Sequence, residues 1–226
     1  MAGKLALRIG KRRIPLWLWG PVALAALAVG GYFGLWQPLR KYIFPTNWGV
    51  VEEGRIYRSG LMKPNLVKRT LAEHNIRVIV ALNGREADDP DQMAQEEAAK
   101  ELNIEILRFP MRGNGTPGDA NAADGLRKYA GALAAVVKAR RESKPVLIQC
   151  GAGTHRTGGI VATYRVLVEK RPPSEAYAEL RRYGWDPDKH QDLLKFLNPN
   201  MAELAKIMVE MGVIDRVPNP VPVIGP

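Results

Sequence analysis

Cysteine is nearly absent from this chain of 226 residues, which has a single one, Cys150, and only three histidines. One cysteine excludes an intramolecular disulfide framework and any metal site built from several cysteines. The sequence also lacks a Walker-type glycine loop, a serine–histidine–aspartate context and paired metal-ligand spacings. The chemistry of this chain must therefore be sought around isolated residues, Cys150 first among them.

Acidic residues are missing from the first 41 residues, which accounts for most of the net charge of +10. This stretch holds seven basic residues, so residues 42–226 carry only the remaining +3. The seven are Lys4, Arg8, Lys11, Arg12, Arg13, Arg40 and Lys41. A basic excess gathered around one segment is not the charge pattern of a nucleic-acid groove, and we expect no nucleic-acid partner.

Charge of either sign is absent from residues 16–36, a run of 21 residues. A helix of this length covers roughly 30 Å, the thickness of the hydrocarbon layer of a bilayer. Aromatic residues that favour the membrane interface lie towards its two ends, at Trp17, Trp19, Tyr32 and Trp36. The segment therefore predicts one transmembrane helix at 16–36, with a lipid bilayer as partner.

The orientation follows from the flanking charges, because five basic residues precede this segment and two follow it. The positive-inside rule keeps the basic N-terminus, residues 1–15, in the cytoplasm and sends the rest across, as in a single-pass protein of a bacterial inner membrane. A cleaved signal peptide is the alternative, since Ala23, Ala25, Ala26 and Ala28 offer small residues for cleavage. The apolar run exceeds a usual signal core, which favours an uncleaved anchor.

Beyond this segment, apolar β-branched runs alternate with helical patterns, which is typical of an open α/β sheet. The predicted strands are a short extended piece at 55–57 that ends at Ser59-Gly60, and 77–82, 104–109 and 145–149. The predicted helices are 65–74, 90–102, 122–141, 157–170, one with Ser174 as its N-cap, and 189–211 interrupted near Pro199. We expect a mostly parallel sheet of four to five strands flanked by helices, in a domain at 47–212. A linker at 37–46 precedes this domain, and a disordered proline-rich tail at 213–226 follows it.

The strand at 145–149 leads directly into Cys150 and the stretch CGAGTHRTGG. In open α/β sheets, ligands bind beyond the carboxyl ends of the strands, where Cys150 stands. A loop of this length before a helix can turn successive backbone N–H groups inward at the positive end of the helix dipole. Small side chains leave that space open at Gly151, Gly153, Gly158 and Gly159. The stretch predicts a cradle for a tetrahedral dianion.

Two further residues of this stretch fit the same chemistry. Arg156 can fold back across the cradle and bind two oxygens bidentately, which lysine does less well. The amides, the dipole and this guanidinium favour the thiolate form of Cys150, which is then placed for in-line attack on phosphorus. Thr157 can donate its hydroxyl to the sulfur and help the thiolate leave in the second step.

The alternative for Cys150 is a buried thiol that acts as a small apolar side chain, the usual fate of a free cysteine. Against this, composition alone would put glycine at +3, arginine at +6 and threonine at +7 with odds on the order of 1 in several thousand. The pattern favours a reactive cysteine.

The spacing Cys150-x5-Arg156-Thr157 resembles the signature loop of protein tyrosine phosphatases, and PVLIQCGAGTHRTG is similar to that of atypical dual-specificity phosphatases of plants, fungi and bacteria. GRIYRSG at 54–60 and VIVALNGRE at 78–86 look like the opening strand and early sheet of that group. The resemblance covers about residues 47–198 and leaves out the apolar segment and the tail.

The resemblance implies a cysteinyl-phosphate mechanism without metal or other cofactor. The substrate would be phosphotyrosine, phosphoserine or phosphothreonine in a protein, or a small phosphorylated molecule; some relatives with a loop ending His-Arg-Thr-Gly cleave inositol pyrophosphates. Carried over, Cys150 is the nucleophile, Arg156 the phosphate clamp and Thr157 the hydrogen-bond partner of the sulfur. The loop residues that would bind the phosphate are Gly151, Ala152, Gly153, Thr154, His155 and Arg156.

One departure from the family concerns Gln149, since the family usually has histidine before the cysteine. An amide can hydrogen-bond the loop but brings no chargeable group, so we expect less thiolate and slower turnover than in typical members.

The family also supplies a general acid about thirty residues upstream. Asp119, 31 residues before Cys150 in a glycine- and proline-rich loop, is the first candidate, although the position also suits a helix N-cap. Asp124, 26 residues upstream and already in the helix, is the second.

The remaining charged residues are interpreted more simply. His155 is expected to order the loop rather than carry a proton. His74 and His190 are expected to be structural or exposed. Arg112 and Lys189 could add charge at the mouth of the site, but solvated surface positions are favoured. The pair Arg181 and Arg182 indicates the wet face of a helix.

Two other functions stay open. A rhodanese-type sulfurtransferase also sets a cysteine in an anion-binding loop, but that loop is usually one residue shorter. A pseudophosphatase would bind phosphorylated ligands without turnover, and Gln149 keeps this alternative open. The substrate is not fixed by the sequence, although the absence of lysine between Cys150 and Arg156 weakens the case for highly charged inositol polyphosphates.

Overall fold

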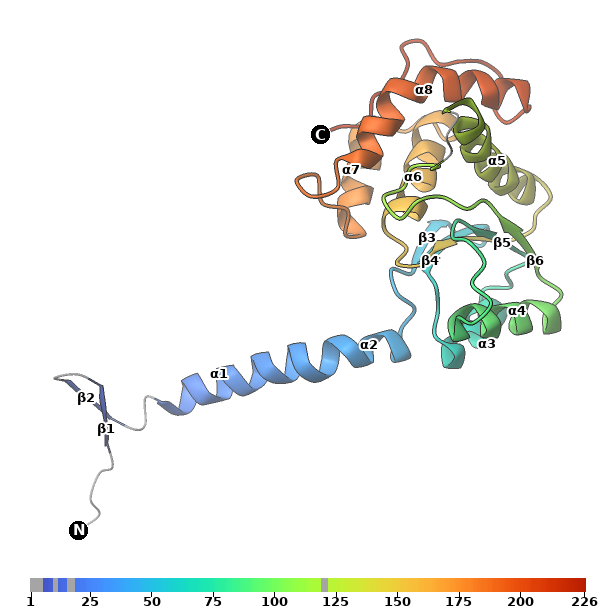
Figure 1. Cartoon of the computed structure of the whole chain (residues 1–226). Helices are drawn as coiled ribbons and strands as arrows, with labels where there is room; N and C mark the ends of the chain where they lie inside the picture. Colours follow the sequence, from blue (N-terminus) through green and yellow to red (C-terminus); the bar gives the residue numbers. More distant parts are fainter. Residues whose placement is uncertain (1–5, 10–11, 16–18, 119–121) are drawn as a thin grey trace. The chain divides into compact units, whose positions relative to one another are not determined.

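The computed structural model describes residues 6–9, 12–15, 19–118 and 122–226, and it divides into two units, 1–43 and 44–226 (Figure 1). The first unit contains a short antiparallel hairpin of β1 (Ala6–Ile9) and β2 (Arg12–Pro15), which the sequence analysis did not predict. A continuous helical stretch follows, made of α1 (Trp19–Gly31), a π-helical turn η2 (Tyr32–Trp36) and α2 (Gln37–Ile43).

This helical stretch differs at its end from the sequence prediction. Residues 16–18, the start of the predicted span, lie outside the described part of the chain. The helix does not end at Trp36 but continues to Ile43, so the first seven residues of the predicted linker are helical. Pro38 directly follows the π-helical turn η2, where the regular hydrogen-bond pattern of the α-helix is already interrupted, and the leucine, arginine and lysine that follow are good helix formers.

The second unit is built on a five-stranded sheet in the order β3-β4-β7-β5-β6. The strands β4 (Ile56–Gly60), β7 (Val146–Cys150), β5 (Val78–Ala81) and β6 (Glu105–Arg108) are parallel and confirm the four predicted strands. The edge strand β3 (Gly49–Glu52) pairs antiparallel with β4 and was not predicted. The mostly parallel α/β sheet expected from the sequence is therefore confirmed.

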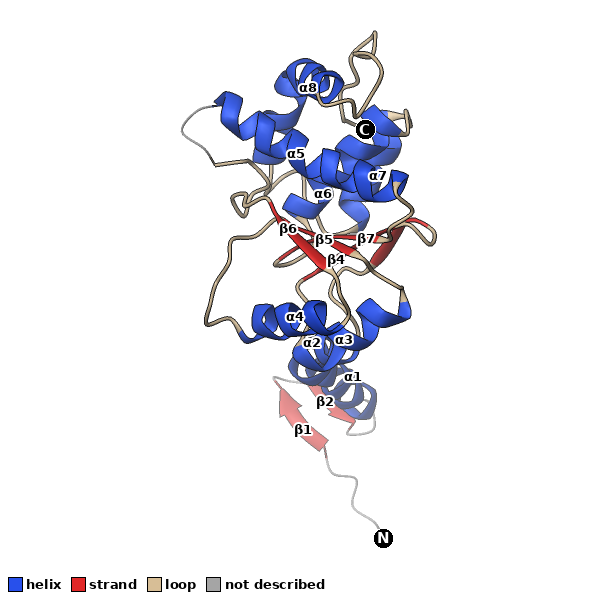
Figure 2. Ribbon diagram, turned by 90° about the vertical axis from the view of Figure 1, so that its right-hand side faces the viewer, coloured by secondary structure: helices blue, strands red, loops and turns tan. Residues whose placement is uncertain are grey.

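Helices cover both faces of this sheet (Figures 1 and 2). The helices α3 (Pro64–Glu73) and α4 (Pro90–Glu101) pack on one face, against alternate strand residues that include Tyr57, Ile79 and Leu147. The other face carries α5 (Ala122–Arg141), α6 (His155–Thr163), η3 (Tyr164–Val168), α7 (Pro173–Arg182) and α8 (Asp192–Glu210). Because strand side chains alternate between faces, Cys150 falls in this second core and Gln149 faces the first.

Two details of the helices correct the sequence analysis. The predicted N-cap Ser174 lies inside α7, whose N-cap is Pro172 and whose first residue is Pro173, a position that suits proline. The predicted interruption of the last helix at Pro199 does not occur, and α8 runs through it. Buried Leu193 and Met201 on either side hold both halves of α8 against the same core.

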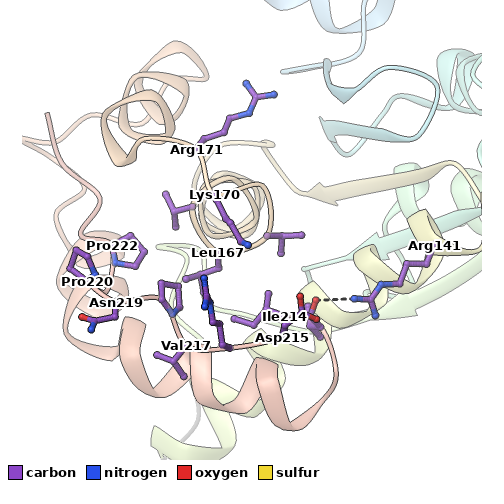
Figure 3. Close-up of a pocket in the computed structure, with 15 residues that line it drawn as sticks. Arg141, Leu167, Lys170, Arg171, Ile214, Asp215, Val217, Asn219, Pro220 and Pro222 are labelled. Atoms are coloured by element: carbon purple, nitrogen blue, oxygen red, sulfur yellow. Dashed lines mark hydrogen bonds between the residues drawn. The ribbon is translucent and has the colours of Figure 1, made fainter.

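The C-terminal segment is the largest correction. It has no helix or strand, but it is not a disordered tail: Val213 and Ile224 are buried. The side chain of Asn198 on α8 accepts a hydrogen bond from the Ile224 N–H at 2.9 Å and donates to its carbonyl at 3.0 Å. The prolines prevent regular structure, yet the valines and isoleucine between them can still fill a groove. With the end of α5 and η3, the segment lines an open pocket of about 910 Å³ (Figure 3), and Cys150 is not among the residues that line it.

Candidate functional site

Cys150 is the last residue of the central strand β7, between β4 and β5, and it is 2% exposed. A four-residue loop, 151–154, joins it to α6, which starts at His155, two residues earlier than predicted. The cysteine therefore lies at the carboxyl end of the parallel strands and at a helix N-terminus, where an anion is favoured.

Three successive carbonyl groups of this loop accept hydrogen bonds from residues outside the loop, which hold their oxygens away from the predicted cradle. The Leu61 N–H donates to Gly151 O at 2.9 Å, and Asn47 Nδ2 donates to Ala152 O at 2.9 Å. The third carbonyl, of Gly153, accepts a hydrogen bond from Arg58 Nη2 at 2.8 Å. In a planar trans peptide, the C=O of one residue and the N–H of the next point in opposite directions. The N–H groups of residues 152, 153 and 154 therefore turn inward.

The sulfur confirms this orientation, because the Gly153 N–H donates to Cys150 Sγ at 3.2 Å. Gly153 can follow this path since it has no side chain: its φ is +73°, and an added Cβ would lie 2.4 Å from the backbone nitrogen of Gly60. The end of β4 thus pins the loop by direct backbone contact, which only glycine permits at residue 153.

Arg156 turns back over the loop rather than away from it. Its Nη1 donates to Leu82 O at 3.5 Å, at the end of β5, and its Nη2 would lie 3.3 Å from a Cβ placed on Gly151. Its Nε is buried and has no hydrogen-bond partner among the described residues. The guanidinium therefore lies over the first residue of the loop with donor capacity to spare, as a phosphate clamp requires.

Thr157 is fully buried at the start of α6, and its hydroxyl has no hydrogen-bond partner within the described chain. The structure records no hydrogen bond from this hydroxyl to Cys150 Sγ, so its role towards the sulfur stays a prediction. A buried hydroxyl without a partner is nonetheless free to donate to a new acceptor formed nearby.

Gln149 does not bond the loop, which corrects one expectation. It is fully buried, and its Nε2 donates to Oε1 of Gln95 on α4, on the opposite face of the sheet from Cys150. Strand alternation explains this, because residues 149 and 150 must point to opposite faces. The residue therefore ties β7 to α4.

His155 lies against His190, and the two ring centroids are 4.2 Å apart. Burial lowers the pKa of His155 below its ordinary value, and the neighbouring His190 lowers it further, so His155 is neutral at pH 7. A neutral ring supports the expected role in ordering the loop. His190 has a structural role, one of the two expected for it, since its ring faces His155 and its carbonyl accepts a hydrogen bond from Trp185 Nε1 at 2.9 Å.

The loop that precedes the predicted general acid reaches the cradle. Asn114 Nδ2 donates to Asp192 Oδ2 on α8 at 3.1 Å, and a Cβ on Gly115 would lie 3.3 Å from the backbone of His155. The first candidate, Asp119, lies outside the described residues, one position beyond the end of this loop. Asp124 is exposed in the first turn of α5, as predicted.

The other charged residues lie away from the cysteine or on the surface. His74 packs against Trp48 with 4.6 Å between the ring centroids, which is a structural role.

The remaining charged residues are on the surface. Lys189 is exposed and forms an ion pair with Asp186 at 3.1 Å. Arg112 is exposed, and the backbone of its loop folds against its side chain at Gly118. Both Arg181 and Arg182 are exposed on α7, as expected.

Two residues that hold the loop were missed by the sequence analysis. Arg58 and Asn47 reach the loop from positions 95 and 105 residues away, and Asn47 also donates to Thr154 Oγ1 at 3.1 Å. One signal was present for Arg58: it is the only charged residue of the strand IYRSG. Within the described ranges, no group of three or more His, Cys, Asp or Glu residues could hold a metal ion.

Comparison with known proteins gives three kinds of similarity. A family model described as "DSP-PTPase phosphatase fused to NAD+ Kinase" matches residues 49–195. Two curated relatives are a putative tyrosine-protein phosphatase OCA1 of Debaryomyces hansenii, 29% identical over 58% of this chain and 63% of that protein, and the inositol diphosphatase DSP3 of Arabidopsis thaliana, 31% identical over 54% of each. The match thus spans less than two thirds of the length of these relatives.

Solved structures share the fold. P. aeruginosa TpbA gives a TM-score of 0.56 at 22% identity and covers 74% of this chain and 91% of its own. The core catalytic domain of the PP-IP phosphatase SIW14 from S. cerevisiae gives 0.57 at 20% identity, covering 75% and 94%. At this identity the likeness concerns the arrangement of helices and strands alone.

Proposed function

Since this chain belongs to the family of DSP-PTPase phosphatase domains, we propose that it hydrolyses phosphate monoesters through a cysteinyl-phosphate intermediate. One observation carries the proposal: three outward-tied carbonyls turn the loop amides towards Cys150 Sγ, under a guanidinium that folds back over Gly151. This arrangement is suited to a dianion with three free oxygens. It has no evident use around a cysteine that only fills a core.

In the proposed first step, the phosphate of the substrate binds to the amides of residues 151–156 and to Arg156. The Cys150 thiolate attacks phosphorus, a sulfur–phosphorus bond forms and the ester oxygen leaves with a proton from Asp119. In the second step, the Asp119 carboxylate left by the first step takes a proton from water, which attacks the phosphorus; the bond to sulfur breaks and inorganic phosphate is released. The thiolate that leaves accepts a hydrogen bond from Thr157, whose buried hydroxyl is unpartnered within the described chain.

The substrate class is a phosphorylated protein or a small phosphorylated molecule, as the names of the curated relatives suggest. Between Cys150 and Arg156 the loop offers only one side chain that can be charged, His155, and its lowered pKa leaves it neutral at pH 7. A monoester with a single phosphate therefore fits the loop better than a densely phosphorylated ring, which needs several cations at the mouth of the site.

Phosphate release from a panel of monoesters tests the proposal. The full-length protein should release phosphate from p-nitrophenyl phosphate and from phosphotyrosine and phosphoserine peptides, and Cys150→Ser should abolish release, because serine is not ionised at neutral pH. A wild type that binds these esters without releasing phosphate would make the protein a pseudophosphatase. Persulfide formation from thiosulfate would indicate a sulfurtransferase.

The same panel separates the two candidate acids. Asp119→Asn should depress turnover of phosphoserine, a poor leaving group, by about 10²-fold or more, and that of p-nitrophenyl phosphate much less. Asp124→Asn is the matched control and should leave both rates nearly unchanged, since this exposed side chain lies in the first turn of α5. Equal losses on both substrates for Asp119→Asn would remove it from the role.

The helix Gly20–Ile43 supports a second part of the proposal, an uncleaved membrane anchor. It is 24 residues long, none of its most apolar window is buried within the described residues, and side chains such as Leu24 and Leu27 are about 70% exposed. The basic N-terminus would remain in the cytoplasm, with the phosphatase domain across the membrane, joined through residues 44–46 in place of the longer linker.

Membrane extraction tests the anchor. The full-length protein should sediment with membranes through alkaline carbonate washing and be released by detergent. Release by salt alone, with a mature N-terminus beyond about residue 30, would show that the segment is a cleaved signal peptide instead.

A further inference from the structure

A fully buried guanidinium, that of Arg58, lies beneath the loop at 151–154. Arg58 is the middle residue of β4 and pairs with Ile148, two residues before Cys150. Charge that is taken out of water costs free energy unless it is paired and hydrogen-bonded. The contacts of Arg58 therefore decide what this charge does.

The guanidinium makes one short hydrogen bond and one stacking contact. Its Nη2 donates to Gly153 O at 2.8 Å, and its Cζ lies 3.7 Å from the centre of the Tyr183 ring. The Tyr183 ring packs against the backbone of Gly49. Its oxygen lies 1.9 Å from where a Cβ on Gly49 would be, so a glycine at this position leaves room for the ring. Nε and Nη1 of Arg58 have no hydrogen-bond partner among the residues described.

The carboxylate nearest to Arg58 is shared. Glu179 Oε1 lies 3.9 Å from Arg58 Nη1, but Arg165 Nε contacts Glu179 Oε2 at 2.8 Å. Arg165 also pairs with Glu169 at 2.7 Å, and Glu169 pairs with Arg171 at 2.8 Å. Charges of alternating sign thus lead from beneath the loop to the half-exposed Arg171.

This sharing leaves the charge of Arg58 only partly neutralised. Burial lowers the pKa of Arg58 to about 10, and Glu179, Tyr183 and Cys150 oppose that change, so the group is protonated at neutral pH. The cationic group on the other side of the cradle is Arg156, while His155 on the same helix is neutral. Cys150 therefore lies between two guanidinium groups, one exposed to the substrate and one buried beneath.

We propose that Arg58 is a positioning residue of the phosphate cradle, which holds the Gly153 carbonyl outward and favours the thiolate form of Cys150 through its buried charge. The inference rests on the proposed function, because it gives Arg58 a part in the same reaction. Fixing the Gly153 carbonyl turns the Thr154 N–H towards the bound phosphate, since the two belong to one peptide plane. Arg58 itself touches no substrate atom.

The rate at which iodoacetamide alkylates the single cysteine measures the fraction present as thiolate, and it does not depend on turnover of a substrate. The rates are measured for the full-length protein at pH 5 and pH 9, and their ratio is compared between variants. Arg58→Gln, which keeps a donor without the charge, should lower the pH 5 to pH 9 ratio roughly tenfold. Arg58→Lys, which keeps the charge, should stay within about twofold of the wild type.

The matched control is Arg140→Gln, which breaks the ion pair of α5 with Glu52 on β3 and involves neither Glu179 nor the loop. It should lower the melting temperature without changing the alkylation ratio. An unchanged ratio in Arg58→Gln, or an equal fall in Arg140→Gln, would overturn the proposal. Should Arg58→Gln fail to fold, Glu179→Gln replaces it: removing the shared carboxylate should raise the ratio, and a fall would contradict the role of Arg58.

Phosphate release by the same variants separates this proposal from the proposed function. If the wild type releases no phosphate but the alkylation ratio falls in Arg58→Gln, the hydrolytic function alone is overturned. If the wild type hydrolyses monoesters but Arg58→Gln keeps the wild-type alkylation ratio, the positioning role alone is overturned.

Discussion

Replacing Arg156 by lysine should lower kcat/KM for a phosphate monoester by about 10²–10³-fold, the loss typical of removing a preorganised donor from a developing anion. The guanidinium reaches from Leu82 O at the end of β5 to the space above Gly151, and its buried Nε is free within the described residues. A planar fork can donate two parallel hydrogen bonds to phosphate from this position, whereas an ammonium offers a single point charge. Steady-state kinetics with p-nitrophenyl phosphate measures the loss.

The control for this change is Arg181→Lys, which makes the same substitution at an exposed position of α7. It should leave kcat/KM within about twofold of the wild type, because exposed charges contribute little. The melting temperature of Arg156→Lys should stay close to that of the wild type, since Arg156 forms no ion pair with any residue that the structure describes. Retention of half or more of the activity by Arg156→Lys would remove the clamp role from this residue.

The segment that carries this chemistry could be predicted from the sequence because its signals are local. The apolar run 145–149 indicates a buried strand, glycines mark the loop, and the periodicity after residue 156 indicates a helix. Each feature depends on neighbours within a few residues. The structure accordingly has β7, the loop and α6 where the pattern indicates them, with boundaries shifted by one or two residues.

The residues that support the loop could not be predicted in the same way, because their partners are distant in the sequence. Arg58 reaches Gly153 across 95 residues, and its environment is completed by Glu179 and Tyr183, more than 120 residues away. His190 meets His155 only because the chain returns after α7. Periodicity indicates that a position is buried, but it does not say which charged group will lie opposite.

The errors at the edges of the domain have a similar cause. The strand β3 has only four residues with a bulge, so its alternation is too short to be distinctive. The C-terminal segment is rich in proline, which indicates the absence of helix and strand but not the absence of packing. Asn198 bonds both the N–H and the carbonyl of Ile224, and this tertiary contact gives the segment its place.

The second large effect is expected for Gly153→Ala, which should reduce phosphate release by at least about 10²-fold, the scale of a small misplacement of reacting groups. The new Cβ would lie 2.4 Å from Gly60 N and 2.6 Å from the Ser59 carbonyl carbon, both backbone atoms at the end of β4. Neither can move cheaply, so the loop must shift and carry its N–H away from Cys150 Sγ. Phosphate release and urea unfolding of the same preparation measure both consequences.

Gly212→Ala is the matched control for the backbone conformation. Gly212 has φ of +67°, close to the +73° of Gly153, but no heavy atom of the described residues lies within 4 Å of its added Cβ. It should therefore show only the left-handed cost of about 1–2 kcal/mol in the free energy of unfolding and no loss of activity. Because the clash adds to the same conformational cost, Gly153→Ala should be less stable than Gly212→Ala by a further 1–3 kcal/mol or so, as overpacked sites are. Equal destabilisation with full activity in both variants would mean that the loop has another path open to it, and that the contact with Gly60 does not hold the cradle in place.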